Sequence, residues 1–339
     1  MTKENVIRMA HGAGGQLMND LIREVFASPL DNAYLRRMAD SAVVPMGERC
    51  PRFAMSTDSF TVRPLIFPGG DIGSLAVHGT VNDVAMSGAR PLWLTVGFIL
   101  EEGLSMDLLQ QVVRSMAEAA GEAEVQIVAG DTKVVERGHG DGIYINTAGV
   151  GIVPDGRAIG PDLARPGDAV LINGTLGDHG IAVLSKREGL TFETDLISDS
   201  AALNALVEAL LAAAPRVHCL RDPTRGGLAA ALNELAGTSD VGIEIDESAI
   251  PIRPAVSAAC EMMGFDPLTV ANEGKMVVFV PQEEAQAALN ALRAHPLGTN
   301  AARIGMVTAE HPGMVLVQTG IGGRRVLDMP LGELLPRIC

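Results

Sequence analysis

The stretch RFAMSTDSFTVRPLIFPGGDIGSLAVHGTVNDVAMSGA, residues 52–89, carries the main signals for the fold. Residues 52–60 are typical of a strand that stops at an acidic turn, and residues 74–88 are typical of a helix. The Gly- and Pro-containing segment between them interrupts both patterns, as a turn does. The unit is therefore a strand followed by a helix, and this order recurs along the chain.

The rest of the first half continues the alternation. Apolar residues recur at helical spacing across 105–121, a helix that Ser105 would cap and Gly121 would end. Extended apolar runs predict strands at 91–100, 124–132 and 142–153, the first of them buried.

A passage rich in Gly and Pro at 153–168 interrupts this order and predicts a domain boundary. The alternation then restarts with a strand from residue 168, strands at 275–280 and 313–320, and helices at 181–190, 226–237 and 282–294. We therefore expect an α/β (α+β) fold, and neither an all-α nor an all-β one. The expected units are an N-terminal domain 1–155, a C-terminal domain 156–320 and a flexible tail 321–339.

Length and charge narrow the function classes. A chain of 339 residues fits two domains. Its net charge of −15 argues against nucleic acid and anionic membranes as partners, since both require basic patches. The N-terminus has no apolar signal segment and the four cysteines show no CxxC spacing, so we expect a reducing cytoplasmic location.

Four aspartates stand where strands or helices are expected to end: Asp58, Asp71, Asp83 and Asp131. Carboxylates that converge in a cleft repel one another unless a divalent cation lies between them, which favours Mg²⁺. For any single one of them, a role as a turn or cap residue is the alternative.

Other polar residues suggest a nucleotide site of an unusual kind. Lys133 follows Asp131 closely and suits a phosphate oxygen, although a solvated surface lysine is the alternative. Glu273 in ANEGK is either a general base or an exposed turn residue. The loop GTLGDHG, which contains Gly177 and Asp178, offers backbone N–H groups to an anion. The GxxxxGK[ST] and GxGxxG motifs are absent, so a nucleotide would be bound in some other way.

The last residue, Cys339, is a free thiol at the very end of the chain. Pro336 prevents helix continuation, so the last residues are expected to be extended. A terminal thiol contributes little to a core. It is therefore either accidental or carried to a place of use.

Six segments, taken together, carry a family resemblance: residues 58–89, VAGDTKVV (128–135), GTLGDHG (174–180), RDPTRGGLA (221–229), ANEGK (271–275) and PRIC (336–339). They resemble the HypE family of hydrogenase-maturation carbamoyl dehydratases along essentially the whole chain. The NDVAMSGA and GDT pieces are shared with a wider group of ATP-using enzymes similar to aminoimidazole ribonucleotide synthetase. The terminal PRIC is the specific part.

The resemblance implies a two-domain aminoimidazole ribonucleotide synthetase-like fold whose N-terminal domains pair into a homodimer. It also implies that a HypF-type carbamoyltransferase loads a carbamoyl group onto Cys339. The enzyme would then dehydrate this group to a thiocyanate with ATP and Mg²⁺. The cyano group would pass to iron held by a HypC–HypD complex, as a ligand of the nickel–iron hydrogenase centre.

The resemblance also implies roles for individual residues, with Cys339 as the carrier. Glu273, partnered by Lys133, would act on the proton, and which of the two removes the decisive one stays open. The implied metal residues are Asp58, Asp83 and Asp131, with Asp222 as a further candidate that has a structural alternative. The implied nucleotide-binding set is Asp58, Asp71, Asp83, Asp131, Thr132, Gly177 and Asp178.

Two other interpretations predict different properties. A selenophosphate synthetase or a thiamine-phosphate kinase of the same superfamily has no use for a terminal PRIC, and the first of these needs a reactive residue near the N-terminus. Here the first cysteine is Cys50. A binding scaffold whose tail only docks on a partner would not turn over ATP.

Overall fold

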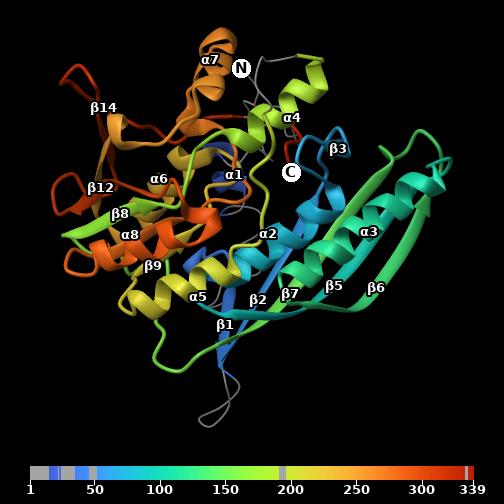
Figure 1. The fold of residues 1–339 in the computed structure, drawn as a ribbon, viewed down its shortest axis with the longest axis horizontal. Coiled ribbons are helices and arrows are strands. Elements are labelled where there is room, and N and C mark those ends of the chain that lie inside the picture. Colours follow the sequence, from blue (N-terminus) through green and yellow to red (C-terminus); the bar gives the residue numbers. More distant parts are fainter. Residues whose placement is uncertain (1–14, 22, 24–34, 46–51, 191–195, 333–334) are drawn as a thin grey trace.

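The computed structural model describes residues 15–21, 23, 35–45, 52–190, 196–332 and 335–339, so Cys50 lies outside the described ranges. The chain forms two β-sheets with helices packed against them (Figure 1). Residues 154–167 connect the last strand of the first sheet to the first strand of the second.

The N-terminal sheet has the strand order β1-β2-β7-β5-β6. Its strands are β1 (Ala42–Pro45), β2 (Arg52–Phe60), β5 (Arg90–Glu101), β6 (Gln126–Val135) and β7 (Ile143–Val153). Neighbouring strands run antiparallel except β5 and β6, which run parallel because α3 connects them. A small hairpin of β3 (Ile66–Phe67) and β4 (Gly70–Asp71) precedes the first long helix.

Helices α2 (Ile72–Met86) and α3 (Met106–Glu122) cover one face of this sheet (Figure 1). Every second residue of β7 is buried beneath them, as expected for a strand with one covered face. The opposite face, here called the outer face, carries the exposed apolar side chains of Met55, Trp93 and Ile99. Such exposed apolar groups on a sheet are a feature of surfaces that bind another protein.

The C-terminal sheet has the strand order β14-β13-β10-β12-β8-β11-β9. Its strands are β8 (Asp168–Ile172), β9 (Cys219–Arg221), β10 (Gly242–Asp246), β11 (Val277–Pro281), β12 (Ala302–Thr308), β13 (Val315–Gln318) and β14 (Arg324–Val326). Strands β8 and β11 are buried on both faces, which explains their continuous apolar sequences.

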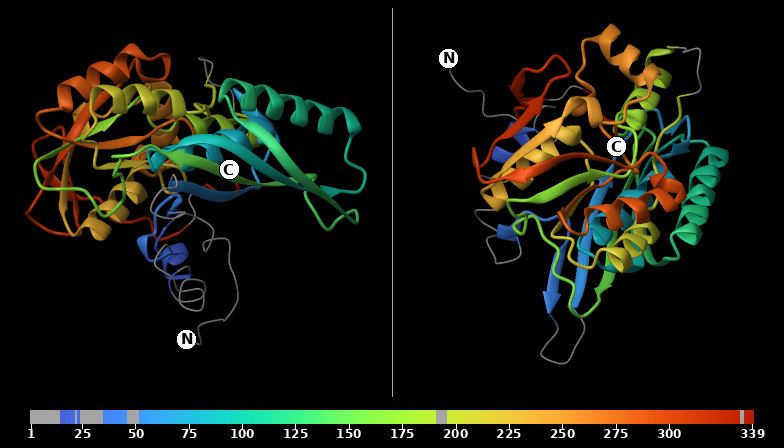
Figure 2. Two further views of the ribbon diagram at one scale, coloured as in Figure 1. Left: turned by 90° about the horizontal axis from the view of Figure 1, so that it is seen from below. Right: turned by 60° about the vertical axis from the view of Figure 1, so that its left-hand side comes forward.

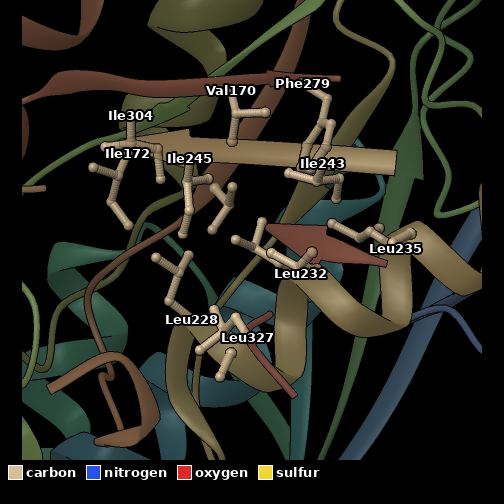
Figure 3. Close-up of a cluster of buried hydrophobic side chains, with 14 of the residues drawn as sticks. Val170, Ile172, Leu228, Leu232, Leu235, Ile243, Ile245, Phe279, Ile304 and Leu327 are labelled. Carbon is tan, nitrogen blue, oxygen red and sulfur yellow. The ribbon is translucent and has the colours of Figure 1, made fainter. Parts of the chain in front are cut away.

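Helices pack on both faces of the C-terminal sheet. On one face, α6 (Gly227–Ser239) inserts Leu228, Leu232 and Leu235 against strand residues such as Ile243 and Phe279 (Figure 3). On the other face, α5 (Asn204–Ala213) and α8 (Ala285–Ala294) form a second apolar cluster. The remaining α-helices of the described chain are α1 (Gln16–Leu21), α4 (Asp178–Glu188) and α7 (Pro254–Met263).

Three expectations differ from the structure in detail. Gly121 does not end α3, because the chain continues to Glu122 and turns at Glu124, which has a positive φ of 55°. Strand β5 is half-buried, because helices cover only one face of its sheet. The first part of the expected tail is not free, because β14 pairs with β13.

The end of the chain returns to the region between the two sheets. The C-terminus lies beside α4 and β3, as the ribbon views show (Figures 1 and 2). Among the described helices, none combines the length and apolar character that crossing a bilayer requires.

Candidate active site

Helix α2 connects the N-terminal domain to the C-terminal one through Asn82. The Asn82 amide nitrogen donates to the carbonyl oxygens of Ala201 (3.0 Å) and Glu273 (3.1 Å), and its oxygen accepts from the backbone N–H of Leu203 (2.7 Å). Asn82 is buried, so these bonds form in a low-dielectric setting where satisfied polar groups define a single arrangement. The next residue, Asp83, therefore has a defined position.

Asp83 belongs to a group of three carboxylates, here called the acidic cluster, formed by Asp40, Asp83 and Asp222. One side-chain oxygen of each lies within 4.8 Å of the others. The hydroxyl of Ser56 donates to Asp83 at 2.6 Å and orients it. The cluster combines the segment before β1, α2 and the RDPTRGGLA segment, which are far apart in the sequence.

Arg221 is the cation adjoining the acidic cluster. It forms ion pairs with Asp40 and with Glu234, each with a nitrogen–oxygen distance of 2.5 Å. Burial raises the pKa of Asp40 to about 8, with Arg221 opposing the shift. Burial likewise raises the pKa of Asp222 to about 6. The pKa of Asp83 is raised well above its ordinary value, first by burial and then by the charges of the other carboxylates.

The chemistry of these donors fits a hard divalent cation. Carboxylate oxygens that approach one another and resist ionisation are stabilised when Mg²⁺ or a similar ion lies between them. The surrounding charges support this: the acids are Asp40, Asp58, Asp83, Asp222, Glu234 and Glu273, and the cations that offset them are Arg221 and Arg225. The acids outnumber the guanidinium groups, so Asp40, Asp83 and Asp222 are the residues that could hold the metal.

Asp58, at the C-terminal part of β2, lies beside this cluster. Its charge raises the pKa of Asp83, and its own pKa is raised by burial and opposed by Arg225. The structure thus brings together Asp58, Asp83 and the further candidate Asp222, and it adds Asp40.

Asp71, predicted to bind the cofactor, is used at the start of α2. Its Oδ1 accepts hydrogen bonds from the backbone N–H groups of Gly73 (2.8 Å) and Ser74 (3.1 Å) and from the hydroxyl of Ser115 (2.7 Å). The hydroxyl of Ser74 bonds back to the N–H of Asp71 at 3.1 Å and completes a capping box. The geometry favours a capping role for Asp71.

Asn272 joins the separate motifs of the C-terminal domain. Its oxygen accepts from the N–H of Gly177 (2.8 Å), and its amide donates to the carbonyls of Pro223 (2.8 Å) and Val270 (3.1 Å). The segments ANEGK, GTLGDHG and RDPTRGGLA therefore meet at one side chain. Gly177 has a φ of 81°, a conformation that glycine adopts without strain and that lets α4 begin here.

Asp178 follows as the first residue of α4. Its carboxylate accepts from the hydroxyl of Thr175 and lies 3.3 Å from the guanidinium of Arg253. A pocket of ≈ 260 Å³ adjoins this loop and is lined by residues that include Asp178 and Lys275. Asp178 therefore borders a polar pocket, as a residue of a ligand-binding loop would, whereas Gly177 is not among the residues that line it.

Glu273 is a buried acid without a satisfied side chain. It is 3% exposed, and its Oε1 has no hydrogen-bond partner among the described residues. Burial and the charge of Asp58 raise its pKa well above the ordinary value. A buried carboxyl with a raised pKa and a free oxygen is suited to proton transfer.

The chain end docks next to this acid. The backbone N–H of Thr61 donates to the carbonyl of Cys339 at 3.0 Å, and His179 Nε2 lies 2.8 Å from the carbonyl of Ile338. The side chain of Ile338 is 2% exposed and packs in the N-terminal apolar cluster. His179 is held at Nδ1 by the hydroxyl of Ser198, at 2.8 Å.

The environment of Cys339 combines a cation with acids. Burial raises the pKa of the Cys339 thiol to about 12, Arg225 opposes this shift, and Glu273 and Asp58 add to it. The charge of the Cys339 thiolate is the largest cause of the raised pKa of Arg225. The terminal thiol is therefore close enough to Arg225 and to the predicted base Glu273 for both charges to shift its pKa.

Asp131, Thr132 and Lys133 are not part of this group within a single chain. All three lie on the exposed edge strand β6, and the side chains of Asp131 and Lys133 are 70% and 69% exposed. The Lys133 amine lies 2.7 and 2.9 Å from the Asp131 carboxylate oxygens. Strand pairing places Asp131 and Lys133 opposite Gly97 and Ile99, so they share the outer face of the sheet. Lys133 consequently does not partner Glu273 in the same chain.

Several functional residues were missed from the sequence. Asp40 precedes a short strand without any motif around it, and only the folded chain brings it to Asp83. Arg225 and Asn272 stand inside the RDPTRGGLA and ANEGK motifs, so their neighbours were a usable signal. Asn82 and His179 likewise stand inside motifs, but their hydrogen-bond partners, such as Ile338 for His179, are distant in sequence.

The chain matches two family profiles and long relatives. The profile of the AIR synthase related protein, N-terminal domain, covers residues 38–153, and that of the C-terminal domain covers 165–317. Carbamoyl dehydratase HypE of Azotobacter vinelandii is 56% identical over 335 residues, or 98% of this chain and 97% of the relative. Carbamoyl dehydratase HypE of Escherichia coli (strain K12) is 48% identical over 338 residues, or 99% of this chain and 100% of the relative.

Solved structures agree with the sequence relatives. A chain in a crystal structure of a HypE–HypF complex has a TM-score of 0.87 and 50% identity, covering 91% of this chain and 99% of that one. Hydrogenase maturation protein HypE in complex with ATP has a TM-score of 0.83 and 52% identity, covering 97% and 98%. AaThiL complexed with AMPPCP and TMP is 23% identical with a TM-score of 0.70, which shows a common fold only.

Proposed function

The chain belongs to the HypE family of carbamoyl dehydratases, which act in hydrogenase maturation, and we propose that it dehydrates an S-carbamoyl group on its own Cys339 to a thiocyanate with ATP. The observation that carries the proposal is the docking of the chain end between the two domains. Cys339 lies there beside Arg225 and the buried Glu273, next to the acidic cluster. A scaffold whose tail only binds a partner has no reason to dock its own half-buried thiol among ionisable groups.

The reaction converts the thiocarboxamide and ATP into the thiocyanate, ADP and phosphate. Amide oxygen is a poor leaving group, so its attack on the γ-phosphorus first turns it into a phosphate ester oxygen. The C–O bond then breaks, phosphate departs, and the nitrogen loses both protons as the C≡N bond forms. Such a transfer depends on in-line placement and charge neutralisation.

The residues of this chain support those steps. Glu273 is placed to accept a nitrogen proton, because burial gives its carboxylate a high affinity for one. The guanidinium of Arg225 lies near the sulfur and favours negative charge developing on the carbamoyl oxygen. Docking of the tail replaces a bimolecular encounter by an intramolecular one. We keep Lys133 as a second candidate for proton transfer.

ATP is the proposed phosphoryl donor and Mg²⁺ the proposed metal. Asp40, Asp83 and Asp222 would hold the ion, with Asp58 beside them, and Mg²⁺ would neutralise phosphate charge when bound. Asp178 borders a polar pocket that suits part of the nucleotide, and Gly177 precedes it in the same loop. The relative solved in complex with ATP supports this choice of cofactor.

We also propose a homodimer that pairs the outer faces of the N-terminal sheets. Met55, Trp93 and Ile99 would be covered by the second copy, which removes exposed apolar surface. Asp131 and Lys133 lie at the edge of this face, with Thr132 between them on the same edge strand, so pairing would bring this segment to the cleft of the partner chain. This arrangement accounts for functional motifs on a strand remote from the cleft of its own chain.

Two macromolecular partners complete the proposal. A HypF-type carbamoyltransferase would load Cys339, as the structure of a relative in a HypE–HypF complex supports. A HypC–HypD complex would accept the cyano group for the nickel–iron centre. A cytoplasmic location suits these steps, since a reducing compartment keeps the terminal cysteine as a thiol.

Mass spectrometry of the carbamoylated protein tests the proposal. After addition of Mg-ATP, the peptide containing Cys339 should lose one water while one ATP is hydrolysed. Cys339→Ala should accept no carbamoyl group, whereas Cys260→Ala, which removes a different buried thiol, should react normally. A carbamoyl group that persists through ATP turnover contradicts the proposed reaction.

A further inference from the structure

The docked tail is held by one arginine of α4. Arg187 donates to the carbonyl of Arg63 through Nε (2.9 Å) and Nη2 (2.6 Å), to that of Pro336 through Nη1 (2.5 Å), and to that of Arg337 through Nη2 (2.7 Å). Arg63 belongs to the N-terminal domain, α4 to the C-terminal one, and the other two acceptors to the tail. One guanidinium group thus joins three parts of the molecule.

The tail also pairs with the N-terminal domain through backbone hydrogen bonds, although it forms no strand and Arg337 has a positive φ of 52°. Thr61 donates to the carbonyl of Cys339 at 3.0 Å, and the N–H of Arg63 donates to that of Arg337 at 3.1 Å. Arg337 itself forms an ion pair with Asp141 and donates to the carbonyl of Thr61 at 2.9 Å. Pairing of this kind relies on the backbone and not on the identity of side chains.

None of these described bonds involves the sulfur of Cys339. The contacts of Arg187, Thr61 and Asp141 are made to backbone carbonyls or to Arg337. These hydrogen bonds can therefore form whether the sulfur carries hydrogen, a carbamoyl group or a cyano group. Cys339 is half-buried while the tail is docked, so an external enzyme reaches its thiol more easily when the tail is released.

We propose that Arg187 is a positioning residue that sets the balance between the docked and released tail. The inference rests on the proposed function in taking Cys339 as a carrier that a partner loads. A carrier must leave the cleft for loading and return for dehydration, and Arg187 determines the fraction of time spent in each position. Arg187 touches the tail backbone and not the reacting atoms.

Loss of Arg187 should increase the fraction of released tail and decrease the fraction of docked tail. The guanidinium makes two bonds to the tail and two to Arg63, and a charged hydrogen bond contributes a factor of about ten or more to an equilibrium. Arg187→Ala should therefore raise the alkylation rate of Cys339 by iodoacetamide about 10- to 100-fold. Single-turnover dehydration should slow when the fraction of molecules with a docked tail decreases. The alkylation rate of Arg187→Lys should lie between those of the wild-type protein and Arg187→Ala, because an ammonium cannot bridge three carbonyls.

The experiment uses the full-length protein and quantifies alkylation of the peptide 334–339 released by cleavage after Glu333. The control is Lys186→Ala, which removes a neighbouring exposed cation that makes no hydrogen bond to the described tail residues. Asp141→Asn provides an independent variant on the other domain, and it should raise alkylation about threefold by weakening the ion pair with Arg337. Thermal unfolding and ATP binding should match the wild-type protein in each variant.

The outcomes separate the two proposals. Faster alkylation and slower dehydration in Arg187→Ala, with Lys186→Ala unchanged, supports the positioning role. Wild-type alkylation of Cys339 in both Arg187→Ala and Asp141→Asn overturns it. Alkylation requires no carbamoyl chemistry, so faster labelling with no water loss in the wild-type protein would contradict the proposed reaction and leave the role of Arg187 standing.

Discussion

Replacement of Asp71 separates capping from cofactor binding. The structure uses one carboxylate oxygen to cap α2, whereas the motif in the sequence predicts nucleotide binding. In Asp71→Ala the N–H groups of Gly73 and Ser74 and the hydroxyl of Ser115 lose their acceptor. In Asp71→Asn the side-chain oxygen remains, and Asn caps helices as well as Asp does.

The magnitude follows from these bonds. Loss of an N-cap costs about 0.5–2 kcal/mol, and a buried donor without a partner costs about 1–3 kcal/mol more. Asp71 is 5% exposed, so water cannot easily replace the lost acceptor. We therefore expect Asp71→Ala to lower the free energy of unfolding by about 2–4 kcal/mol and the Tm by roughly 5–15 °C. Asp71→Asn should cost less than about 1 kcal/mol.

The measurement pairs thermal unfolding with calorimetric titration of Mg-ATP. If Asp71 is a cap, the two variants differ in stability, and Asp71→Asn binds nucleotide as the wild-type protein does. If Asp71 is a nucleotide ligand, Asp71→Asn keeps its Tm and loses affinity about tenfold or more. That second result would add a ligand role, whereas an Asp71→Ala variant with the wild-type Tm would refute the capping assignment.

Three further predictions concern the proposed reaction. Glu273→Gln should slow single-turnover dehydration about 10²–10⁴-fold with ATP affinity unchanged, and normal dehydration at saturating ATP would remove Glu273 from the mechanism. Burial raises the pKa of Asp40 to about 8 and of Asp222 to about 6, so both take up protons as the pH falls from 8 to 6. Mg²⁺ binding should accordingly weaken as the pH falls over this range, and it should release protons. Calorimetry in two buffers of different ionisation enthalpy measures both effects. An affinity for Mg²⁺ that does not depend on pH would contradict this prediction. If Asp131 serves the partner chain, mixing inactive Asp131→Asn with inactive Cys339→Ala should restore about a quarter of the wild-type activity, because half of the dimers are mixed and each has one complete site. A mixture as inactive as its components would place Asp131 in its own chain's cleft or outside the reaction.

Much of the fold could be predicted from local signals. The strand and helix expected within 52–89 correspond to β2 and α2, although β2 runs through Asp58 to Phe60 and does not stop at an acidic turn. The helical spacing at 105–121 corresponds to α3, because periodicity reflects which side of an element is buried. The end of α3 was misplaced at Gly121, since Glu124 adopts the turn conformation although its side chain does not favour it. The pairing of β14 with β13 depends on partners distant in sequence, which no periodicity reveals.

The candidate site likewise contains residues that local motifs reveal and residues that they do not. Asp58, Asp83, Glu273 and Cys339 could be found because their motifs are local, and the structure places all four in one region. Asp40 has no such motif, and Asp131 and Lys133 lie on a different surface of the chain. Spacing along the sequence therefore identified residue types suited to the chemistry, while it could not say which of them meet.

The sequence by itself determined the succession of strands and helices, the family and the terminal thiol. These properties depend on neighbouring residues, whose periodicity and motifs are readable without a fold. Only the tertiary structure decided that Asp71 caps a helix, that Asp40 joins Asp83, and that the tail docks through Arg187. The physical reason is that hydrogen bonds, ion pairs and raised pKa values depend on distances between atoms, and folding brings together groups that are hundreds of residues apart in the chain.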